Sequence, residues 1–176
     1  LIISAVEHSC IMETASWQTK MGAVNSIAPV DKYGFVSAEK ISNLIRPETF
    51  LVSVMHANNE IGTIEPIEEI AKICKEKNVL FHTDAVQTFT KIPIDLKKFP
   101  ADLLSISSHK IYGPKGVGAL FVREGTKLEP LLHGGGQELG LRSGTENIAG
   151  AVGFAKAAEL ALAEQKKEMP RQQKLR

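Results

Sequence analysis

Two observations predict an α/β fold, with a mostly parallel sheet flanked by helices. Short apolar runs of the kind found in buried strands recur along the chain, at residues 1–6, 50–55, 79–83, 103–107 and 117–122. Several of them are continuously apolar, as expected for strands that are covered on both faces. Helical patterns lie between these runs, and such alternation is typical of βαβ units.

The two ends of the chain indicate a segment of a larger protein. The first apolar run, Leu1 to Val6, has the character of a core strand, yet no earlier element leads into it. Residues 164–176 form a polar helical or linker stretch without a closing element. We therefore expect residues 1–176 to be part of one domain that is incomplete at both ends.

Three helices are predicted. Ser37 is a plausible N-cap for a helix over about 38–46, which packs through Ile41, Leu44 and Ile45. The clearest helix spans Pro66 to Lys77, because proline fits the first helical position and two glutamates follow it. Its buried stripe is Ile67, Ile70, Ala71 and Cys74. The last helix, about 147–168, is rich in alanine, and its packing residues include Val152, Phe154, Ala158 and Leu162.

Composition excludes several classes of protein. A chain with 43% hydrophobic and 23% charged residues can bury a core, so it is not intrinsically disordered. Its 21 Lys+Arg and 20 Asp+Glu give no basic surface for nucleic acid, and no apolar run approaches the ~20 residues that cross a bilayer. Cys10 and Cys74 cannot make a disulfide framework, and no Cys/His spacing resembles a zinc site. We expect a cytoplasmic protein without membrane or nucleic-acid partners.

Polar residues follow four of the predicted strands. In an open parallel sheet, ligands bind beyond the carboxyl ends of the strands, where loops and helix N-termini converge. One polar strand end usually just begins a solvated loop, but four in one chain favour a site. The four segments are Glu7-His8, His56-Ala57-Asn58-Asn59-Glu60, His82-Thr83-Asp84-Ala85-Val86-Gln87 and Ser107-Ser108-His109-Lys110.

Lys110 and Asp84 suggest the chemistry of that site. An isolated lysine is usually an ordinary surface residue, and an aspartate at a strand end often caps a following helix. Lys110, however, lies between a strand end and the Gly-rich turn 112–116, where a restrained amine can form a Schiff base. A carboxylate such as Asp84, placed at the ring nitrogen of a pyridine cofactor, keeps that nitrogen protonated and makes the ring an electron sink.

Two other enzyme classes are alternatives to this interpretation. The segment His133-Gly134-Gly135-Gly136 resembles the oxyanion-hole motif of lipases, but the chain has no G-x-S-x-G nucleophile elbow. A metal hydrolase is conceivable because several side chains could converge at the sheet edge, namely His8, His56, His82, Asp84 and His109. That interpretation would leave Lys110 without a role, and no metal ligands are predicted.

Six motifs occur along the chain in a fixed order: Glu7-His8, residues 56–63, residues 82–87, residues 107–116, His133-Gly134-Gly135-Gly136-Gln137-Glu138 and Arg142-Ser143-Gly144-Thr145-Glu146-Asn147. In order and spacing they resemble the motifs of the NifS-like cysteine desulfurases, pyridoxal-phosphate enzymes of the class V aminotransferase group. The resemblance runs from about residue 1 to the final helix. It implies the central part of the large domain of a fold type I pyridoxal-phosphate enzyme, with the small C-terminal domain absent.

The resemblance assigns the catalytic residues. Lys110 resembles the lysine that binds the cofactor as a Schiff base and later moves protons at the α-carbon of the substrate. His8 resembles the histidine that stacks on the cofactor ring and assists proton transfer. Asp84 matches the partner of the ring nitrogen.

Five further positions match cofactor ligands of the family. Gln87 and Asn59 match residues that bond the phenolic oxygen of the ring. Ser107 and His109 match phosphate ligands, since hydroxyl and imidazole N–H groups suit a phosphate. Thr145 resembles a threonine that reaches the phosphate of the neighbouring subunit, which implies a homodimer with composite active sites.

The implied activity is release of alanine from L-cysteine, with the sulfur passed to an enzyme cysteine as a persulfide for iron-sulfur cluster or thio-cofactor assembly. A sulfur-acceptor protein such as an iron-sulfur scaffold is the expected partner. In the family the nucleophilic cysteine lies well downstream of the lysine, beyond this chain, so the chain alone is expected to be inactive. Cys74 is expected to be a core residue and Cys10 a helix residue.

Two alternatives stay open at this point. The protein could be a selenocysteine lyase or another pyridoxal-phosphate enzyme of the class V group, because none of these residues separates a sulfur from a selenium substrate. It could also be a catalytically incomplete module that binds the cofactor or dimerises.

Overall fold

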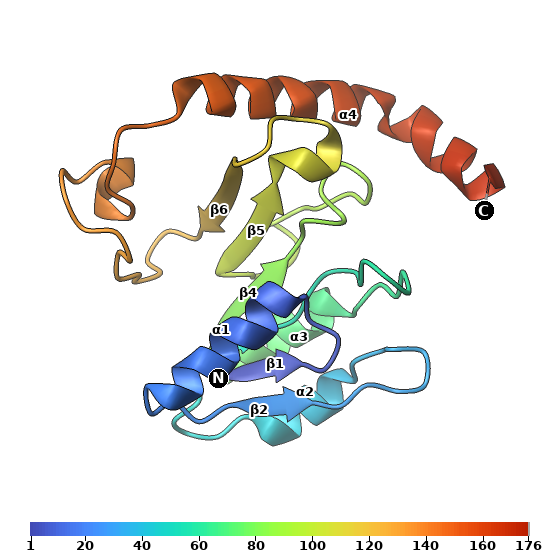
Figure 1. The fold of residues 1–176 in the computed structure, drawn as a ribbon. Helices are drawn as coiled ribbons and strands as arrows, with labels where there is room; N and C mark the ends of the chain where they lie inside the picture. Colours follow the sequence, from blue (N-terminus) through green and yellow to red (C-terminus); the bar gives the residue numbers. More distant parts are fainter. Residues whose placement is uncertain (176) are drawn as a thin grey trace.

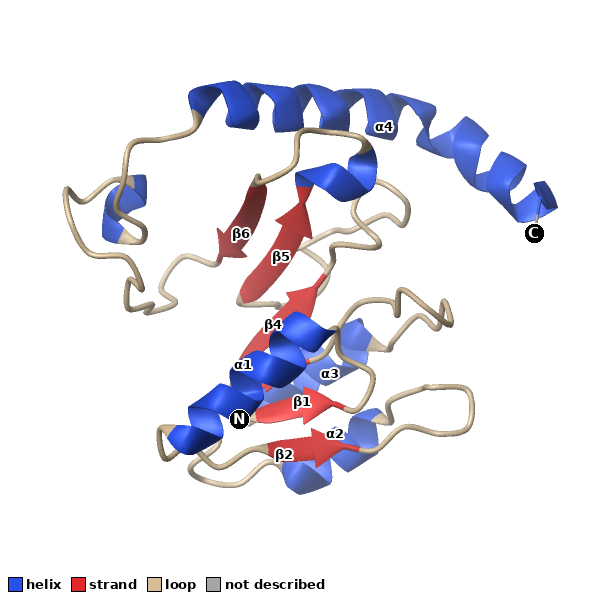
Figure 2. Ribbon diagram, viewed as in Figure 1, coloured by secondary structure: helices blue, strands red, loops and turns tan. Residues whose placement is uncertain are grey.

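The computed structural model describes residues 1–175 and contains one six-stranded sheet with helices on both faces (Figure 1, Figure 2). The strands are β1 (Ile2–Ser4), β2 (Ser26–Ala28), β3 (Leu51–Ser53), β4 (Leu80–Asp84), β5 (Leu103–Ser107) and β6 (Gly118–Val122). The α-helices are α1 (Ser9–Lys20), α2 (Ala38–Leu44), α3 (Ile67–Glu76) and α4 (Ile148–Leu175). Two short 3-10 helices are η1 (Ser108–Ile111) and η2 (Glu138–Gly140).

The sheet is mostly parallel, as predicted. The strand order is β2-β1-β3-β4-β5-β6; every neighbouring pair is parallel except β5 with β6, which is antiparallel. All five predicted strands are present. β2 was not predicted, because it is three residues long and has only Ala28 fully buried. Cys10 lies in a helix as expected, but the sequence predicts no bounds for α1, whose single buried residue is Ala15.

The main core lies between the sheet and the layer of α2 and α3, on the face opposite α1 (Figure 1). The predicted stripe of α3 is fully buried and includes Ile67, Ile70, Ala71 and Cys74. Ser37 caps α2 as predicted, accepting a hydrogen bond from the backbone N–H of Lys40 at 3.4 Å. Pro66 directly precedes α3 instead of being its first helical residue.

The final helix is longer than predicted, and two of its predicted packing residues are wrong. α4 crosses the molecule beside the β5–β6 end of the sheet and continues to residue 175 (Figure 1). Phe154 is buried and meets Phe89 edge to face, with ring centroids 6.1 Å apart. Val152 and Leu162 are more than half exposed, because only the helix face that carries Gly150 and Phe154 lies on the rest of the protein.

Small residues let α4 approach the turn that follows η1. A Cβ atom added at Gly113 would overlap the Ser108 hydroxyl oxygen and would lie 3.1 Å from the Ala157 Cβ atom of α4. A Cβ atom at Gly150 would lie 2.5 Å from a methyl group of Val117. Since Lys110 belongs to η1, this close packing also restrains the segment that carries the candidate catalytic lysine.

We predict that Gly113→Ala lowers the free energy of unfolding by about 1–3 kcal/mol, because the added methyl group overpacks the contact between η1 and α4. Urea unfolding followed by circular dichroism measures this change. The Ser108 hydroxyl oxygen is buried without a hydrogen-bond partner among the described residues, so Ser108→Ala alone should cost little. The double variant should regain part of the lost stability. Equal losses in the single Gly113→Ala variant and the double variant would contradict this explanation.

Candidate functional site

The carboxyl ends of β1, β3, β4 and β5 meet at one edge of the sheet, where a cavity of about 250 Å³ lies. Seven of the eight predicted site residues line it, together with Cys10, Met55 and Val86; the seven are His8, Asn59, Asp84, Gln87, Ser107, His109 and Lys110. The eighth, Thr145, is exposed in the loop before α4 and does not line the cavity. The topology therefore brings together residues that are up to about a hundred positions apart.

Lys110 is presented by a short, well-anchored turn. Ser108 and Ile111 of η1 are buried, while His109 and Lys110 between them are exposed. The turn ends at Tyr112, which has a left-handed backbone with φ of 65°, and the Gly113 N–H donates to the Ser108 carbonyl at 3.1 Å. The sequence thus fixes the backbone on both sides of the lysine and leaves its side chain free to react.

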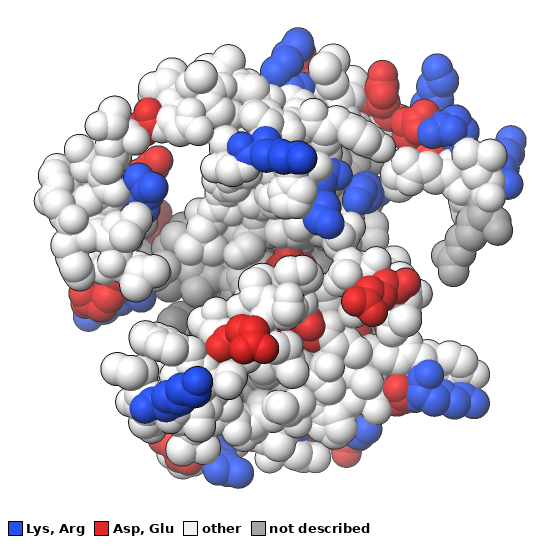
Figure 3. Space-filling model, in the orientation of Figure 1, with Lys and Arg blue, Asp and Glu red and all other residues white. Residues whose placement is uncertain are grey.

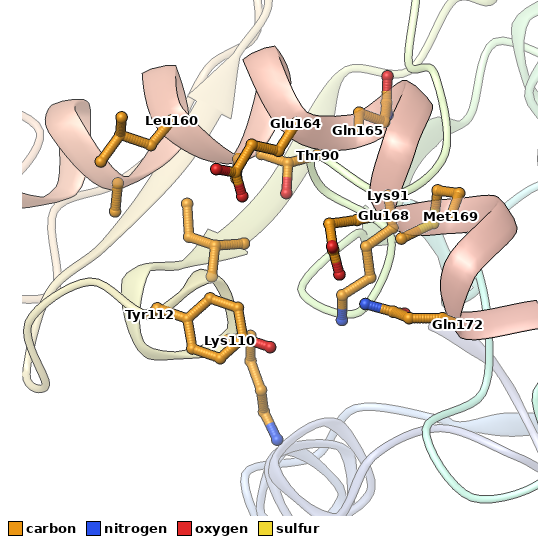
Figure 4. Close-up of a pocket in the computed structure, with 13 residues that line it drawn as sticks. Thr90, Lys91, Lys110, Tyr112, Leu160, Glu164, Gln165, Glu168, Met169 and Gln172 are labelled. Carbon is orange, nitrogen blue, oxygen red and sulfur yellow. The ribbon is translucent and has the colours of Figure 1, made fainter. Parts of the chain in front are cut away.

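A second cavity of about 310 Å³ lies between η1 and α4 and also includes Lys110 (Figure 4). Figure 4 shows the Lys110 side chain extending away from α4, so that its amine leaves this cavity. Lys91 instead extends toward Gln172 of α4. The methylene chain of Lys110 therefore lines the second cavity, and the Lys110 amine is available to the cavity at the sheet edge.

The predicted phosphate ligands are already paired. The Ser107 hydroxyl group and the His109 Nδ1 atom are 2.7 Å apart, directly after β5. This contact orients the imidazole ring and leaves its Nε2 atom available to an external group. A hydroxyl group and an imidazole on one turn form a suitable donor set for a phosphate.

Asp84 is the last residue of β4 and is 8% exposed. Its Oδ1 atom accepts a hydrogen bond from the Val86 N–H at 2.8 Å, which is a local turn and not the cap of an α-helix. Its Oδ2 atom makes no hydrogen bond within residues 1–175. One carboxylate oxygen at the cavity can therefore accept a proton or hydrogen bond from a ligand.

Gln87 has a partner that the sequence did not reveal. The Lys91 amine donates to the Gln87 Oε1 atom at 3.4 Å. Burial, and then the charge of Lys110, lower the pKa of Lys91. Because its oxygen is engaged, the amide nitrogen of Gln87 is the free donor on the cavity side.

His8 is the N-cap of α1. Its Nδ1 atom accepts from the Cys10 N–H at 3.2 Å, so Nε2 carries the proton of the neutral ring. Asn59 lies in the loop after β3, and the neighbouring Asn58 fixes that loop. The Asn58 Oδ1 atom accepts from the Glu60 and Ile61 N–H groups at 2.8 and 3.0 Å.

The two cysteines have different environments, and neither has the features of an activated nucleophile. Cys74 is buried in α3 as predicted, and its pKa is raised to about 12, mainly by burial. Cys10 lies in the first turn of α1 and also in the cavity wall. Burial, followed by the negative charge of Asp84, raises the pKa of its thiol, which disfavours the reactive thiolate.

Two histidines of the metal-hydrolase alternative, His56 and His82, do not join His8, His109 and Asp84 in the cavity. His82 contacts the Ser53 and Ser105 hydroxyl groups at 2.8 and 2.9 Å through its two ring nitrogens, so it is used within the sheet. His56 contacts the Thr88 hydroxyl group at 2.8 Å. In the part of the chain that the structure describes, no three His, Cys, Asp or Glu side chains are arranged to hold a metal ion.

Glu7 is a residue of this region to which sequence reasoning gave no role. It is 8% exposed, and its Oε1 atom accepts from the Ser4 hydroxyl group at 2.5 Å and from the Met55 N–H at 2.7 Å. Its Oε2 atom is buried without a partner among the described residues. Burial raises the pKa of Glu7 to about 7, against the effect of its two hydrogen bonds and with a contribution from Asp84.

The residues at the cavity fit pyridoxal phosphate. Lys110 supplies an amine for its aldehyde and Asp84 a free carboxylate oxygen for its ring nitrogen. Ser107 and His109 supply donors for its phosphate, while Met55 and Val86 add apolar surface. These groups line one cavity at the sheet edge, so a single ligand can contact all of them.

Charge on the face seen in Figure 3 adds no further candidate. Figure 3 shows positive and negative side chains interspersed on the viewed face, without an extended area of one sign. No helix within residues 1–175 is long and apolar enough to cross a membrane.

Comparison with known proteins identifies relatives along the whole described chain. Residues 1–175 match the family model for class-V aminotransferases. Cysteine desulfurase IscS of Dictyoglomus turgidum is 53% identical over 176 residues, which are 100% of this chain and 45% of that protein. Cysteine desulfurase IscS of Clostridium botulinum is 57% identical over 162 residues, which are 92% of this chain and 41% of that protein. The chain thus spans less than half the length of these relatives.

Solved structures share the fold. A NifS-like protein aligns with a TM-score of 0.90 at 48% identity, covering 94% of this chain and 46% of that one. SspA in complex with cysteine aligns with a TM-score of 0.87 at 45% identity, covering 90% of this chain and 46% of SspA.

We predict that Glu7 makes the protein less stable as pH rises from about 4.5 to about 7. Its pKa rises from an ordinary 4.5 to about 7 on folding, so the folded state binds more protons in this window and the free energy of unfolding decreases with pH. The full shift corresponds to about 3 kcal/mol. Urea unfolding between about pH 5 and pH 8 measures this decline, which Glu7→Gln should remove.

Subtracting the pH profile of stability of Glu7→Gln from that of the wild-type protein isolates the contribution of Glu7. Burial lowers the pKa values of His56 and His82, and these groups make stability rise with pH in both proteins. Parallel pH profiles for the wild-type protein and Glu7→Gln would contradict the prediction.

Proposed function

Because this chain belongs to the class-V aminotransferase family, we propose that the protein is a pyridoxal-phosphate-dependent cysteine desulfurase, which releases alanine from L-cysteine and transfers the sulfur to a cysteine of the enzyme. The fold is that of the fold type I pyridoxal-phosphate enzymes. The observation that carries the proposal is the single cavity that joins the Lys110 amine to the Asp84 carboxylate. The identities of 53% and 57% to cysteine desulfurases named IscS support it.

When bound, pyridoxal phosphate supplies an electron sink for the negative charge that develops at the α-carbon of the substrate. Lys110 would hold the cofactor through its amine and, once released by the incoming substrate, accept the α-proton. The free Oδ2 atom of Asp84 would keep the ring nitrogen protonated. His8 would cover the ring, with the N–H of its Nε2 atom available for proton transfer.

The remaining residues bind and orient. The Ser107–His109 pair would donate to the cofactor phosphate, and Gln87 and Asn59 would donate to the phenolic oxygen. Lys91 assists by engaging the Gln87 Oε1 atom, which turns the amide nitrogen toward the cavity. The exposed Thr145 would serve the phosphate of a second subunit, which requires a homodimer.

The persulfide-forming cysteine is proposed to lie outside this chain. Burial raises the pKa of both Cys10 and Cys74, which supports that assignment, as does the share of the relatives that the chain covers. Residues 1–176 would then be part of the large domain, and the small domain would lie elsewhere in the full-length protein. The sulfur acceptor is proposed to be a protein such as an iron-sulfur scaffold, and the location to be the cytoplasm.

Replacing Lys110 tests the proposed function in the full-length protein supplied with pyridoxal phosphate and L-cysteine. Lys110→Ala should lose the visible absorbance of the lysine-bound cofactor and reduce alanine release by about 10²–10⁴-fold, since a positioned proton acceptor contributes about that factor. Lys115→Ala is the matched control, because Lys115 is an exposed lysine in the adjoining turn. It should retain both signals.

Three outcomes would count against the proposal. Wild-type protein without the absorbance would contradict cofactor binding, and absorbance without alanine release would favour a binding module. Turnover of selenocysteine alone would favour a selenocysteine lyase.

A further inference from the structure

Glu7 joins two loops that carry different residues of the proposed site. It lies between β1 and α1, immediately before His8, and its carboxyl group reaches the loop after the neighbouring strand β3. There it accepts the Met55 N–H at 2.7 Å, four residues before Asn59. The same Oε1 atom accepts the hydroxyl group of Ser4, the last residue of β1, at 2.5 Å. One oxygen atom therefore bonds the end of β1 to the loop that contains Asn59.

A second hydrogen bond joins the same loops. The Asn58 Nδ2 group donates to the Val6 carbonyl at 2.9 Å. The residues that carry out both contacts, Glu7 and Asn58, are the direct sequence neighbours of His8 and Asn59. His8 and Asn59 also line two adjacent cavities, the one at Lys110 and another of about 380 Å³ that Glu7 itself lines. The separation of the two loops therefore contributes to the shape of the cavity that Lys110 faces.

Stability alone does not account for a glutamate at this position. Its charged neighbours, Asp84 and Glu65, are both acidic, and no salt bridge within residues 1–175 involves Glu7. Burying a carboxylate without a cationic partner costs free energy, whereas a neutral acceptor could receive both hydrogen bonds at lower cost. A residue that costs stability beside a candidate active site is expected to serve that site.

We propose that Glu7 is a positioning residue, whose carboxyl oxygen fixes the separation between the loop of His8 and the loop of Asn59 and so shapes the cofactor cavity. The proposal rests on the proposed function, since the purpose it assigns to this contact is to prepare the cavity for pyridoxal phosphate. Glu7 does not line the cavity at Lys110, so it acts through its two neighbours.

The chain offers a matched control. Glu65 is also a buried glutamate, at 3% exposed, with a raised pKa and one oxygen without a partner among the described residues. Its other oxygen accepts the Val36 N–H at 2.8 Å, away from the cavity. Glu65 belongs to the same loop as Asn59, but its side chain bonds the Val36 N–H. Glu65→Ala therefore reproduces the loss of a buried carboxyl group that is hydrogen-bonded through one oxygen, without removing either hydrogen bond between the loop of His8 and the loop of Asn59.

The test uses the full-length protein without cofactor, in wild-type form and as Glu7→Ala, Glu7→Gln and Glu65→Ala. Three quantities are measured: the thermal midpoint, the dissociation constant for added pyridoxal phosphate, and the NMR signals of the His8 imidazole in selectively histidine-labelled protein. Both alanine variants should lower the thermal midpoint. Only Glu7→Ala should weaken cofactor binding, by about tenfold or more, and shift the His8 signals in the absence of cofactor.

The conservative variant Glu7→Gln should retain cofactor affinity. A glutamine at position 7 keeps an oxygen that accepts both hydrogen bonds, so Glu7→Gln should bind the cofactor within about threefold of wild type. If Glu7→Ala does not fold, Ser4→Ala removes one of the two bonds and should weaken binding by about two- to tenfold. The positioning role would be overturned if Glu7→Ala bound the cofactor as tightly as Glu65→Ala does. Where Ser4→Ala is used instead, the same comparison with Glu65→Ala applies.

Failure of the two proposals can be told apart. Wild-type protein that does not bind pyridoxal phosphate would overturn the proposed function. The NMR signals of His8 would still report on the position of the loops in that case. Signals that do not shift in Glu7→Ala would overturn the role of Glu7. Ser4→Ala takes the place of Glu7→Ala if the latter does not fold.

Discussion

Parallel pairing of β1 with β3, β3 with β4 and β4 with β5 is the constraint on which the candidate site depends. Parallel strands that share a sheet end on the same edge, so the polar segments after them converge whatever their distance in the sequence. The apolar stripe of α3 and the strand residues packed against it keep this sheet in place. An antiparallel arrangement of the same strands would have divided these segments between two edges.

Buried acidic side chains at the site repel one another. Glu7 and Asp84 are buried close enough to repel each other, and Glu65 adds to the effect on Glu7. Hydrogen bonds from backbone N–H groups partly compensate, at Met55 for Glu7 and at Val86 for Asp84. A cationic ring nitrogen beside Asp84 would relieve this repulsion, which agrees with a cofactor that is protonated on binding.

Sequence reasoning succeeded where the signal is local and failed where it depends on tertiary packing. Apolar runs located five strands, and the spacing of Ile67, Ile70 and Cys74 predicted the buried face of α3. β2 is too short to produce a pattern, and helical periodicity did not reveal that Val152 faces solvent. The seven cavity residues followed from strand ends and family motifs. The Glu7 to Met55 contact joins positions 48 apart, and no local pattern encodes it.

The most direct test of the account is the identity of the lysine that binds the cofactor. Lys91 shares the cavity between η1 and α4 with Lys110, and Lys115 lies in the turn that follows η1. Of these three lysines, only Lys110 lines the cavity together with Asp84. Borohydride reduction of the full-length protein with pyridoxal phosphate, followed by peptide mass spectrometry, identifies the modified residue. We predict a reduced cofactor adduct on Lys110 alone. An adduct on Lys91 or Lys115 with Lys110 unmodified would contradict it.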